Sequence, residues 1–322
     1  MGPLLFRPII KRIRWGGRRL GDVLAKPIGN ESDYAESWEI SDHGEDQSVV
    51  VEGPLAGTTL HELVTNHADE LFGEQSFDRD QFPLLVKFLD ASDRLSVQVH
   101  PNDALARTYQ QDENGKTEAW VILDADRDSR LYVGLKEGID AATLQEHIRS
   151  ETLEECLHTI AVKPGDCVFV PAGTVHAIGE GILLAEIQQS SDLTFRLYDW
   201  GRVGTDGKPR QLHIEDALKC IDFERGPVEP VEPRRLPAGI PAEELVHCPY
   251  FCIRRYRGEG AFQVPEDGRF HVFMVIGGEA RLEWDHESTG LLLGQTALLP
   301  AVRQSTRLHL PADAIVLDAF VP

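Results

Sequence analysis

The sequence contains no long apolar run and few cysteines. No stretch approaches the roughly 18 consecutive apolar residues that a membrane-spanning helix needs, so a membrane span is not expected. Five cysteines are present in 322 residues, and none forms a CxxC pair. An odd number without that spacing argues against a disulfide framework or a zinc ribbon. We therefore predict reduced, structural thiols.

Positive charge is also scarce. Lys and Arg number 32 against 53 Asp and Glu, which gives a formal net charge of −21. A surface this acidic repels nucleic-acid phosphates and anionic lipids, so neither a nucleic acid nor a membrane is expected as a partner. The first 19 residues place an apolar patch before most of the basic residues, which is the wrong order for a signal peptide. We therefore expect a cytoplasmic protein.

From residue 82 onward, short apolar segments recur at close spacing. Strands are expected at 84–89, 95–99, 119–123, 131–133, 158–162, 167–170, 182–188 and 193–198. Helical spacing of apolar residues is found at 59–71, 143–148 and 214–220. Many short strands with few long helices between them predict a mainly β protein, a sandwich or a barrel.

A proline-rich segment divides the chain. It contains Pro227, Pro230, Pro233, Pro237 and Pro241, and it is expected to be a linker or a strap across the surface. Short strands resume after it at 251–256, 270–275, 279–284, 296–299 and 314–319. The expected division is a first domain at 1–222 that includes helical segments, a linker at 223–244 and a second domain at 245–322.

The two halves share a short internal repeat. Gly165 and Pro171 enclose five residues, and so do Gly294 and Pro300. A glycine turn, an apolar strand and a proline turn are structural requirements that both copies keep. Five residues beyond each proline stand His176 in the first copy and Ser305 in the second. We therefore expect two related β domains, of which the second lacks the histidine.

Two further segments place polar side chains on one face of a strand. Residues two apart in a strand point the same way, so Gln98 and His100 should project together. Lys116 and Glu118 share a face by the same rule. With His176 after its proline corner, these segments carry the residue types that bind metals.

The segment from Gly165 to His176, with Pro171 and Gly173 between them, matches the second motif of the cupin superfamily, and Gln98, His100 and Glu118 resemble its first motif. This resemblance implies two cupin-type β-barrels (jelly rolls) with a small helical insertion. It also implies a metal held by His100, Glu118 and His176, with the Gln98 amide as a weak, neutral fourth ligand. Two histidines and one carboxylate suit zinc, iron, manganese or nickel. We expect one Zn²⁺ per chain.

The resemblance extends to a family. Gln98-Val99-His100-Pro101, Lys116-Thr117-Glu118, the run 171–177 and the run 186–200 are similar to type I mannose-6-phosphate isomerases in their short bacterial form. Trp15-Gly16-Gly17 and residues 36–39 also resemble this family. The resemblance implies an aldose–ketose isomerase that interconverts mannose 6-phosphate and fructose 6-phosphate through an enediolate. Thr117 departs from the family, where many members have proline.

Three residues are candidates for catalysis under this resemblance. Arg196 matches the family's active-site arginine, and its fixed charge suits an enediolate or a phosphate oxygen better than a proton shuttle. Lys116 shares a face with Glu118. Asp192 stands four residues before Arg196, which places both on the same face if the strand is regular, and Asp192 could then orient Arg196 or a sugar hydroxyl. Which residue moves the proton stays open. A small sugar phosphate is the expected ligand, and the chain is expected to be a monomer or a homodimer.

Two rival functions use the same elements. A cupin dioxygenase would hold iron with two histidines and a carboxylate, but it usually lacks the Gln98 ligand and the segment from Asp192 to Arg196. A non-catalytic sugar-phosphate sensor would bind its ligand without turnover. Oxygen uptake with iron, ketose formation with zinc, or binding alone would distinguish the three.

Overall fold

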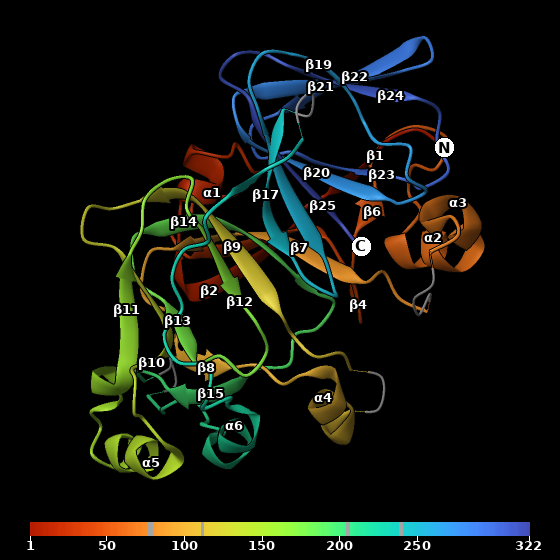
Figure 1. Ribbon diagram of the computed structural model, residues 1–322. Coiled ribbons are helices and arrows are strands. Elements are labelled where there is room, and N and C mark those ends of the chain that lie inside the picture. Colours follow the sequence, from red (N-terminus) through yellow and green to blue (C-terminus); the bar gives the residue numbers. More distant parts are fainter. Residues whose placement is uncertain (76–79, 111–112, 204–206, 238–240) are drawn as a thin grey trace.

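The computed structural model describes residues 1–75, 80–110, 113–203, 207–237 and 241–322 (Figure 1). Antiparallel sheet dominates these residues, which confirms the prediction of a mainly β protein. The first half contains a six-stranded sheet in the order β12 (Cys167–Val170), β9 (Glu118–Ala125), β14 (Ile182–Gln189), β7 (Leu84–Ala91), β3 (Tyr34–Ile40) and β2 (Ile9–Gly17). Its five-stranded sheet has the order β11 (Leu157–Ala161), β10 (Arg130–Leu135), β13 (His176–Ile178), β8 (Val97–Val99) and β15 (Phe195–Tyr198).

The second half also contains one large and one small sheet. The eight-stranded sheet has the order β16 (Arg234–Arg235), β17 (Ala242–His247), β18 (Cys252–Arg257), β25 (Ile315–Phe320), β20 (His271–Gly277), β23 (Thr296–Leu299), β1 (Leu4–Arg7) and β6 (Val49–Val50). The four-stranded sheet has the order β19 (Gly260–Gln263), β24 (Thr306–Leu310), β21 (Glu279–Trp284) and β22 (Glu287–Leu292). A two-stranded hairpin is formed by β4 (Asp42–His43) and β5 (Asp46–Gln47).

The two halves repeat one strand order. The large sheets contain β7-β14-β9-β12 and β18-β25-β20-β23, so in each the first strand pairs with the last, followed by the second and third. The small sheets repeat this order as β8-β13-β10-β11 and β19-β24-β21-β22. The glycines that open β12 and β23, Gly165 and Gly294, both have positive φ, at 92° and 82°. The short sequence repeat therefore marks a repeat of the whole strand arrangement.

The N-terminal strand lies in the sheet of the C-terminal half. Leu4 of β1 is opposite Leu298 of β23, and Figure 1 shows the red β1 beside the blue strands. The proline-rich segment is hydrogen-bonded to the first half by Val228 N–H to Val133 O and by Val231 N–H to Cys167 O. It then provides β16 and the start of β17. The predicted domain boundaries at 222 and 245 stay a proposal.

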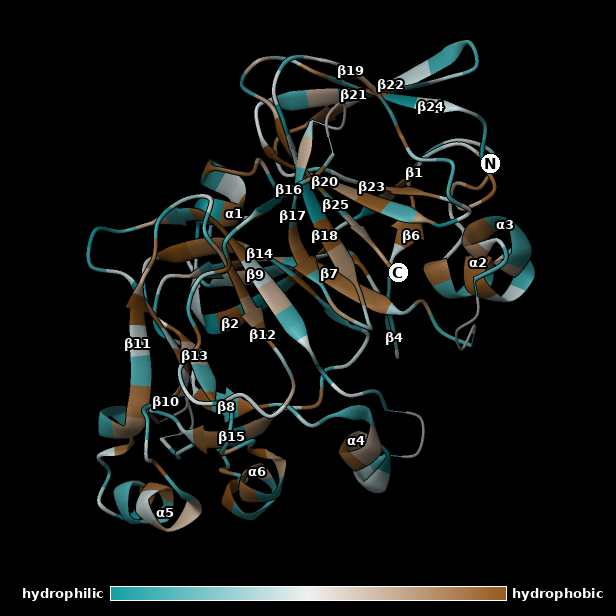
Figure 2. Cartoon of the chain, viewed as in Figure 1, coloured by the Kyte–Doolittle hydropathy of each residue, from teal (hydrophilic) through white to brown (hydrophobic). Residues whose placement is uncertain are grey.

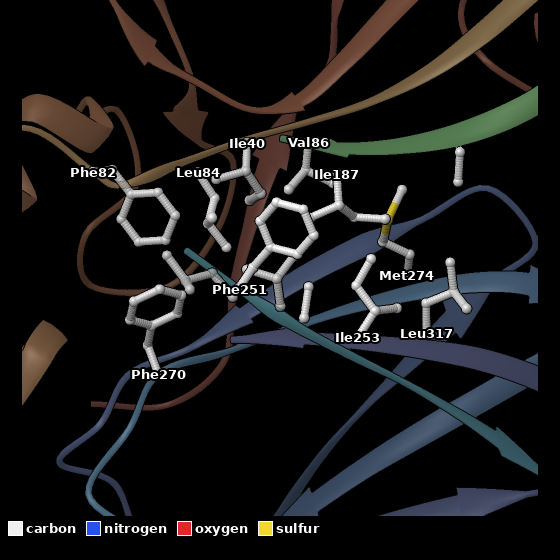
Figure 3. Packing of buried hydrophobic residues seen from close by; sticks show 14 of the residues in the cluster. Ile40, Phe82, Leu84, Val86, Ile187, Phe251, Ile253, Phe270, Met274 and Leu317 are labelled. Carbon is white, nitrogen blue, oxygen red and sulfur yellow. The ribbon is translucent and has the colours of Figure 1, made fainter. Parts of the chain in front are cut away.

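The main hydrophobic core lies between the two large sheets. Side chains alternate along each strand, so Val86 and Ile187 of the first half face Ile253 and Leu317 of the second. Figure 3 shows these side chains packed around Phe251. Figure 2 shows the brown, hydrophobic segments of β7 and β14 at this level. The opposite faces of the same strands point into the interior of each half, and this is how Lys87 and Glu186 become buried.

The helices are short and lie at the periphery (Figure 1). They are α1 (Arg19–Asp22), α2 (Leu60–Asn66), α3 (Ala68–Phe72), α4 (Asp103–Tyr109), α5 (Ala141–Arg149) and α6 (Ile214–Cys220), with a 3₁₀ turn at Leu153–Cys156. The helix expected at 59–71 is two helices that meet at His67, and Thr59 caps the first through a capping box with Glu62. The helices expected at 143–148 and 214–220 are confirmed as α5 and α6.

Among the described residues, no helix is long and apolar enough to cross a bilayer. The five cysteines are free thiols, as expected from their number and spacing. Burial raises the pKa of Cys167 to about 12, so this thiol stays protonated at neutral pH.

Candidate metal centre

Three potential metal ligands converge at one end of the first half. His100 directly follows β8, Glu118 is the first residue of β9 and His176 is the first residue of β13. One ligand atom from each lies within 4.8 Å of the others, and all three side chains are buried. The two sheets of this half therefore bring together residues that are separated by up to 76 positions in the sequence.

Hydrogen bonds to backbone carbonyls orient the two imidazoles. The Nδ1–H of His100 donates to Leu193 O at 3.0 Å, and the Nδ1–H of His176 donates to Thr174 O at 2.9 Å. Each Nε2 therefore carries a lone pair directed at Glu118, at 3.5 Å from its Oε2 and 3.4 Å from its Oε1 respectively. Backbone bonds of this kind are typical of metal-binding histidines, because they fix the tautomer that leaves Nε2 free.

The donor set fits a divalent cation. Two lone pairs and a carboxylate that face one point repel one another unless a positive charge lies between them. The buried Oε2 of Glu118 makes no hydrogen bond of good geometry, and the one cation that contacts it among the described residues is the Lys116 ammonium, at 3.0 Å. Two imidazole nitrogens and one carboxylate suit zinc and other divalent transition metals. We therefore identify this cluster as the candidate metal centre.

Burial sets the protonation of the cluster. It lowers the pKa of His100 well below its usual value and that of His176 to about 4, so both imidazoles are neutral near pH 7. Burial also raises the pKa of Glu118, against the opposing effect of Lys116. Neutral imidazole is the form that binds metals.

Gln98 and Lys116 border the cluster. The Gln98 side-chain amide lies 3.3 Å from His176 Nε2, and these two residues are opposite one another on β8 and β13. Rotation of the Gln98 amide by 180° about its last side-chain bond exchanges its nitrogen and oxygen, so that the oxygen faces the point shared by His100, Glu118 and His176. The Lys116 Nζ lies 3.0 Å from Glu118 Oε2 and 3.3 Å from His100 Nε2. The structure thus brings both residues to the place that the sequence predicts for them.

A cavity of about 590 Å³ opens beside this centre. Its lining includes Gln98, Lys116, Glu118, Asp192 and Arg196. Six cationic side chains line it, namely Lys11, Arg12, Lys87, Lys116, Arg196 and Arg210. A larger cleft of about 930 Å³, bordered by Asp103 and Tyr250, contains none of the candidate ligands. The smaller cavity therefore adjoins the candidate metal centre, and its cationic side chains slightly outnumber its five carboxylates although the chain is strongly acidic.

Arg196 lies half-buried on β15 and faces the cavity. Its Nε donates to Ser96 Oγ at 3.2 Å and its Nη1 donates to Gln211 O at 3.0 Å. Burial and the nearby Arg210 lower the pKa of Arg196. No carboxylate among the described residues forms an ion pair with it, so its charge is available to an anion in the cavity.

Asp192 also lines the cavity, but it lies before β15 begins, and its side chain is exposed. The common strand face expected for Asp192 and Arg196 is therefore wrong, because the chain is not extended in a strand at Asp192. No ion pair joins the two among the described residues, since Arg196 is held by Ser96 and by Gln211. Of the two partners proposed for Asp192, a sugar hydroxyl remains.

A buried ion cluster in the cavity floor was not assigned from the sequence. Lys87 Nζ lies 3.2 Å from Glu186 Oε1 and 3.5 Å from Glu36 Oε2, and Glu186 accepts a hydrogen bond from Trp120 Nε1. Although burial opposes it, the two carboxylates raise the pKa of Lys87, so this ammonium stays charged. The available signal was a lysine inside the otherwise apolar run 84–89, since a charge there needs a buried partner.

Comparison with known proteins agrees with this site. Residues 4–132 match the family model for the catalytic domain of type I phosphomannose isomerase. The chain is 37% identical over 314 residues to mannose-6-phosphate isomerase ManA of Bacillus subtilis, with 98% of each chain covered. It is 35% identical over 298 residues to a mannose-6-phosphate isomerase of Streptococcus mutans, with 92% of each covered.

The crystal structure of the mannose 6-phosphate isomerase from Bacillus subtilis superimposes with a TM-score of 0.90 at 32% identity, and 99% of each chain is covered. The fold and site thus define an enzyme whose candidate metal centre lies between the six-stranded and five-stranded sheets of its first half. The chain belongs to the type I mannose-6-phosphate isomerase family.

Proposed function

We propose that the protein interconverts mannose 6-phosphate and fructose 6-phosphate through an enediolate. The observation that carries the proposal is the adjacency of two features in one cavity. One is the cluster of His100, Glu118 and His176, and the other is the positive charge of Arg196, which forms no ion pair with any carboxylate that the structure describes. The relatives named above are called mannose-6-phosphate isomerases, and this supports the same substrate here.

The cavity suits an anionic sugar. A phosphate ester carries about two negative charges near pH 7, and a protein of net charge −21 repels it at long range. Arg196 and Arg210 provide local attraction, although Arg210 also pairs with Asp199. Fixed guanidinium groups match phosphate or enediolate oxygens through two parallel hydrogen bonds. We assign Arg196 to the oxyanion of the sugar.

The candidate metal centre would hold one divalent cation, which we propose to be Zn²⁺. His100, Glu118 and His176 would be its ligands, with Gln98 as the fourth. Such a cation supplies Lewis-acid charge that favours ionisation of a sugar hydroxyl and polarises a carbonyl. Trp120 contacts the His176 ring edge-on, with centroids 5.4 Å apart, and thereby limits its movement.

The reaction needs a base that takes the proton from C2 and returns it to C1. Lys116 and Asp192 both line the cavity. Lys116 is buried beside Glu118, whereas Asp192 is exposed and makes no ion pair with Arg196. Both assignments stay open. Lys116→Met and Asp192→Asn distinguish them, because loss of the base removes exchange of the C2 proton with solvent.

The test of the function is a coupled assay of purified protein. Fructose 6-phosphate should form from mannose 6-phosphate, and one equivalent of zinc should restore turnover after chelation. Oxygen uptake with iron, or tight sugar-phosphate binding without turnover, would overturn the proposal. A cytoplasmic location, the absence of nucleic-acid and membrane partners, and a monomer or homodimer stay predictions from the sequence.

A further inference from the structure

An ion pair at the edge of the cavity joins β2 of the six-stranded sheet to the separate β4–β5 hairpin. The Lys11 ammonium on β2 contacts the Asp46 carboxylate on the β4–β5 hairpin, and both side chains line the cavity. Their side chains are 30% and 36% exposed. An ion pair this accessible to water contributes little to stability, and separating it costs little.

The other cations of the cavity that form ion pairs have partners that are buried or that lie outside the cavity lining. Lys87 and Lys116 form ion pairs whose side chains are nearly inaccessible to water, with Glu186 and Glu118 as partners. Arg210 is bound by the buried Asp199. Arg12 also lines the cavity, but its partners Asp33 and Glu31 lie outside the cavity lining. Among the described cations of the cavity, Lys11 is the one paired with an accessible carboxylate of the cavity itself, and separating this pair costs little.

Lys11 is also connected to the cavity floor through one aromatic ring. Its Nζ lies 4.8 Å from the centre of the Trp38 ring, and the Lys87 Nζ lies 4.9 Å from the same ring. Contact with a ring keeps an ammonium in place while leaving its hydrogen-bond donors free. A Lys11 released from Asp46 therefore stays at the cavity wall.

We propose that Lys11 is a specificity-determining residue that binds the phosphate group of the sugar, and that Asp46 holds Lys11 while the cavity is empty. This inference rests on the proposed function. A phosphate near pH 7 carries more negative charge than one carboxylate, so it competes successfully for the ammonium. Asp46 then acts against binding, because the phosphate must displace it.

The opposite roles of the two partners give opposite mutational effects. Lys11→Met keeps the length of the side chain and removes its charge, so KM for mannose 6-phosphate should rise about tenfold with kcat little changed. Asp46→Asn removes the competitor, so KM should fall about two- to fivefold. Lys11→Arg keeps the charge, so KM should return to within about threefold of the wild-type value.

A titration of each variant with inorganic phosphate measures binding without turnover. Phosphate should bind Lys11→Met at least about fivefold more weakly and Asp46→Asn more tightly than wild type. A merely structural ion pair would make both variants weaker, in KM and in phosphate affinity, and this result would overturn the inference. Unchanged values in Lys11→Met would overturn it as well. Absence of isomerase activity in the wild type refutes the proposed function instead, and the titration still decides the role of Lys11 in phosphate binding.

Discussion

The two halves of the molecule have the same strand order but different polar interiors. The last residue before the proline, Val170 or Leu299, lies opposite Glu118 in the first half and His271 in the second. His271 thus occupies the position of the candidate ligand Glu118. Further along the same sheets, the pair Lys87 and Glu186 corresponds to Arg254 and Asp318. A cation opposite a buried carboxylate therefore recurs in both halves.

The two halves differ in the contacts that their buried histidine nitrogens make. In the second half, His271 Nδ1 lies 2.7 Å from Asp318 Oδ1, and its Nε2 lies 3.2 Å from Asp267 Oδ1. Both nitrogens are engaged, and Ser305, the counterpart of His176, is exposed. In the first half each Nδ1 donates to a backbone carbonyl, and each Nε2 faces Glu118. The repeated fold buries polar groups in both places, but within the described part of the chain the potential metal-ligand cluster is the one in the first half, where two Nε2 atoms and a carboxylate face a common point.

The largest contrast should come from substitutions at the equivalent positions Glu118 and His271. Glu118→Gln removes the charged ligand, so turnover should fall about a thousandfold and bound zinc should be lost. His271→Gln should keep zinc and turnover per folded molecule within about threefold. Elemental analysis and the coupled assay on both purified proteins check this. Equal loss of activity in the two variants would contradict the distinction between the halves.

The core between the halves should make them one unfolding unit. Phe251→Ala opens a cavity in the shared cluster and should lower the free energy of unfolding by about 3–5 kcal/mol. Leu292→Ala, at a side chain that is 59% exposed, should change it by less than about 0.5 kcal/mol. Urea unfolding followed by fluorescence and circular dichroism measures both. Two separate transitions in the wild type would show that the halves unfold independently.

Arg196→Ala should reduce kcat/KM about a hundredfold while zinc content stays at the wild-type level, because the Arg196 side chain bonds to Ser96 and to Gln211 rather than to the candidate ligands. Arg307→Ala, at an exposed position on β24, is the matched control and should be unchanged. Steady-state kinetics with metal analysis decides the outcome. Unaltered turnover in Arg196→Ala removes this residue from the mechanism.

The second half should show its own pH dependence of stability. Burial lowers the pKa of His271, but Asp318 and Asp267 outweigh it, so the folded-state pKa lies above 6.5. Protonated His271 therefore stabilises the fold below about pH 6.5, and this stabilisation is lost as pH rises through the folded-state value. The free energy of unfolding of wild type minus that of His271→Gln should be larger at pH 6 than at pH 9.5. A difference that grows with pH would reverse the assigned sign.

The sequence predicts those strands whose side chains have a clear pattern. Segments such as 84–89 and 182–188 are apolar on both faces, since one face packs between the halves and the other inside the first half. The strand β2 is missed because charged residues follow one another in it. Lys11 and Arg12 both line the cavity, and Arg12 and Arg14 bond to Asp33 and to Val203 O, so these charges hide its period of two. The strand β1 pairs with residues near 298, and nothing local signals such a partner.

Sequence spacing predicts the relative positions of some of the candidate site residues. Gln98 and His100 lie two apart, and His176 follows a glycine and proline corner, so local rules place them. The partners of Lys87 depend on the alignment of three strands, and Lys11 meets Asp46 only through the hairpin at 42–47. These contacts depend on tertiary packing, which a single sequence does not encode in any local pattern.

The most direct test of the account is the zinc content and turnover of one preparation before chelation, after chelation and after zinc is returned. We predict one zinc per chain, loss of both zinc and turnover on chelation, and recovery of both with one equivalent. Full turnover of a protein with no detectable bound metal would contradict the central claim that His100, Glu118 and His176 hold the ion that the reaction needs.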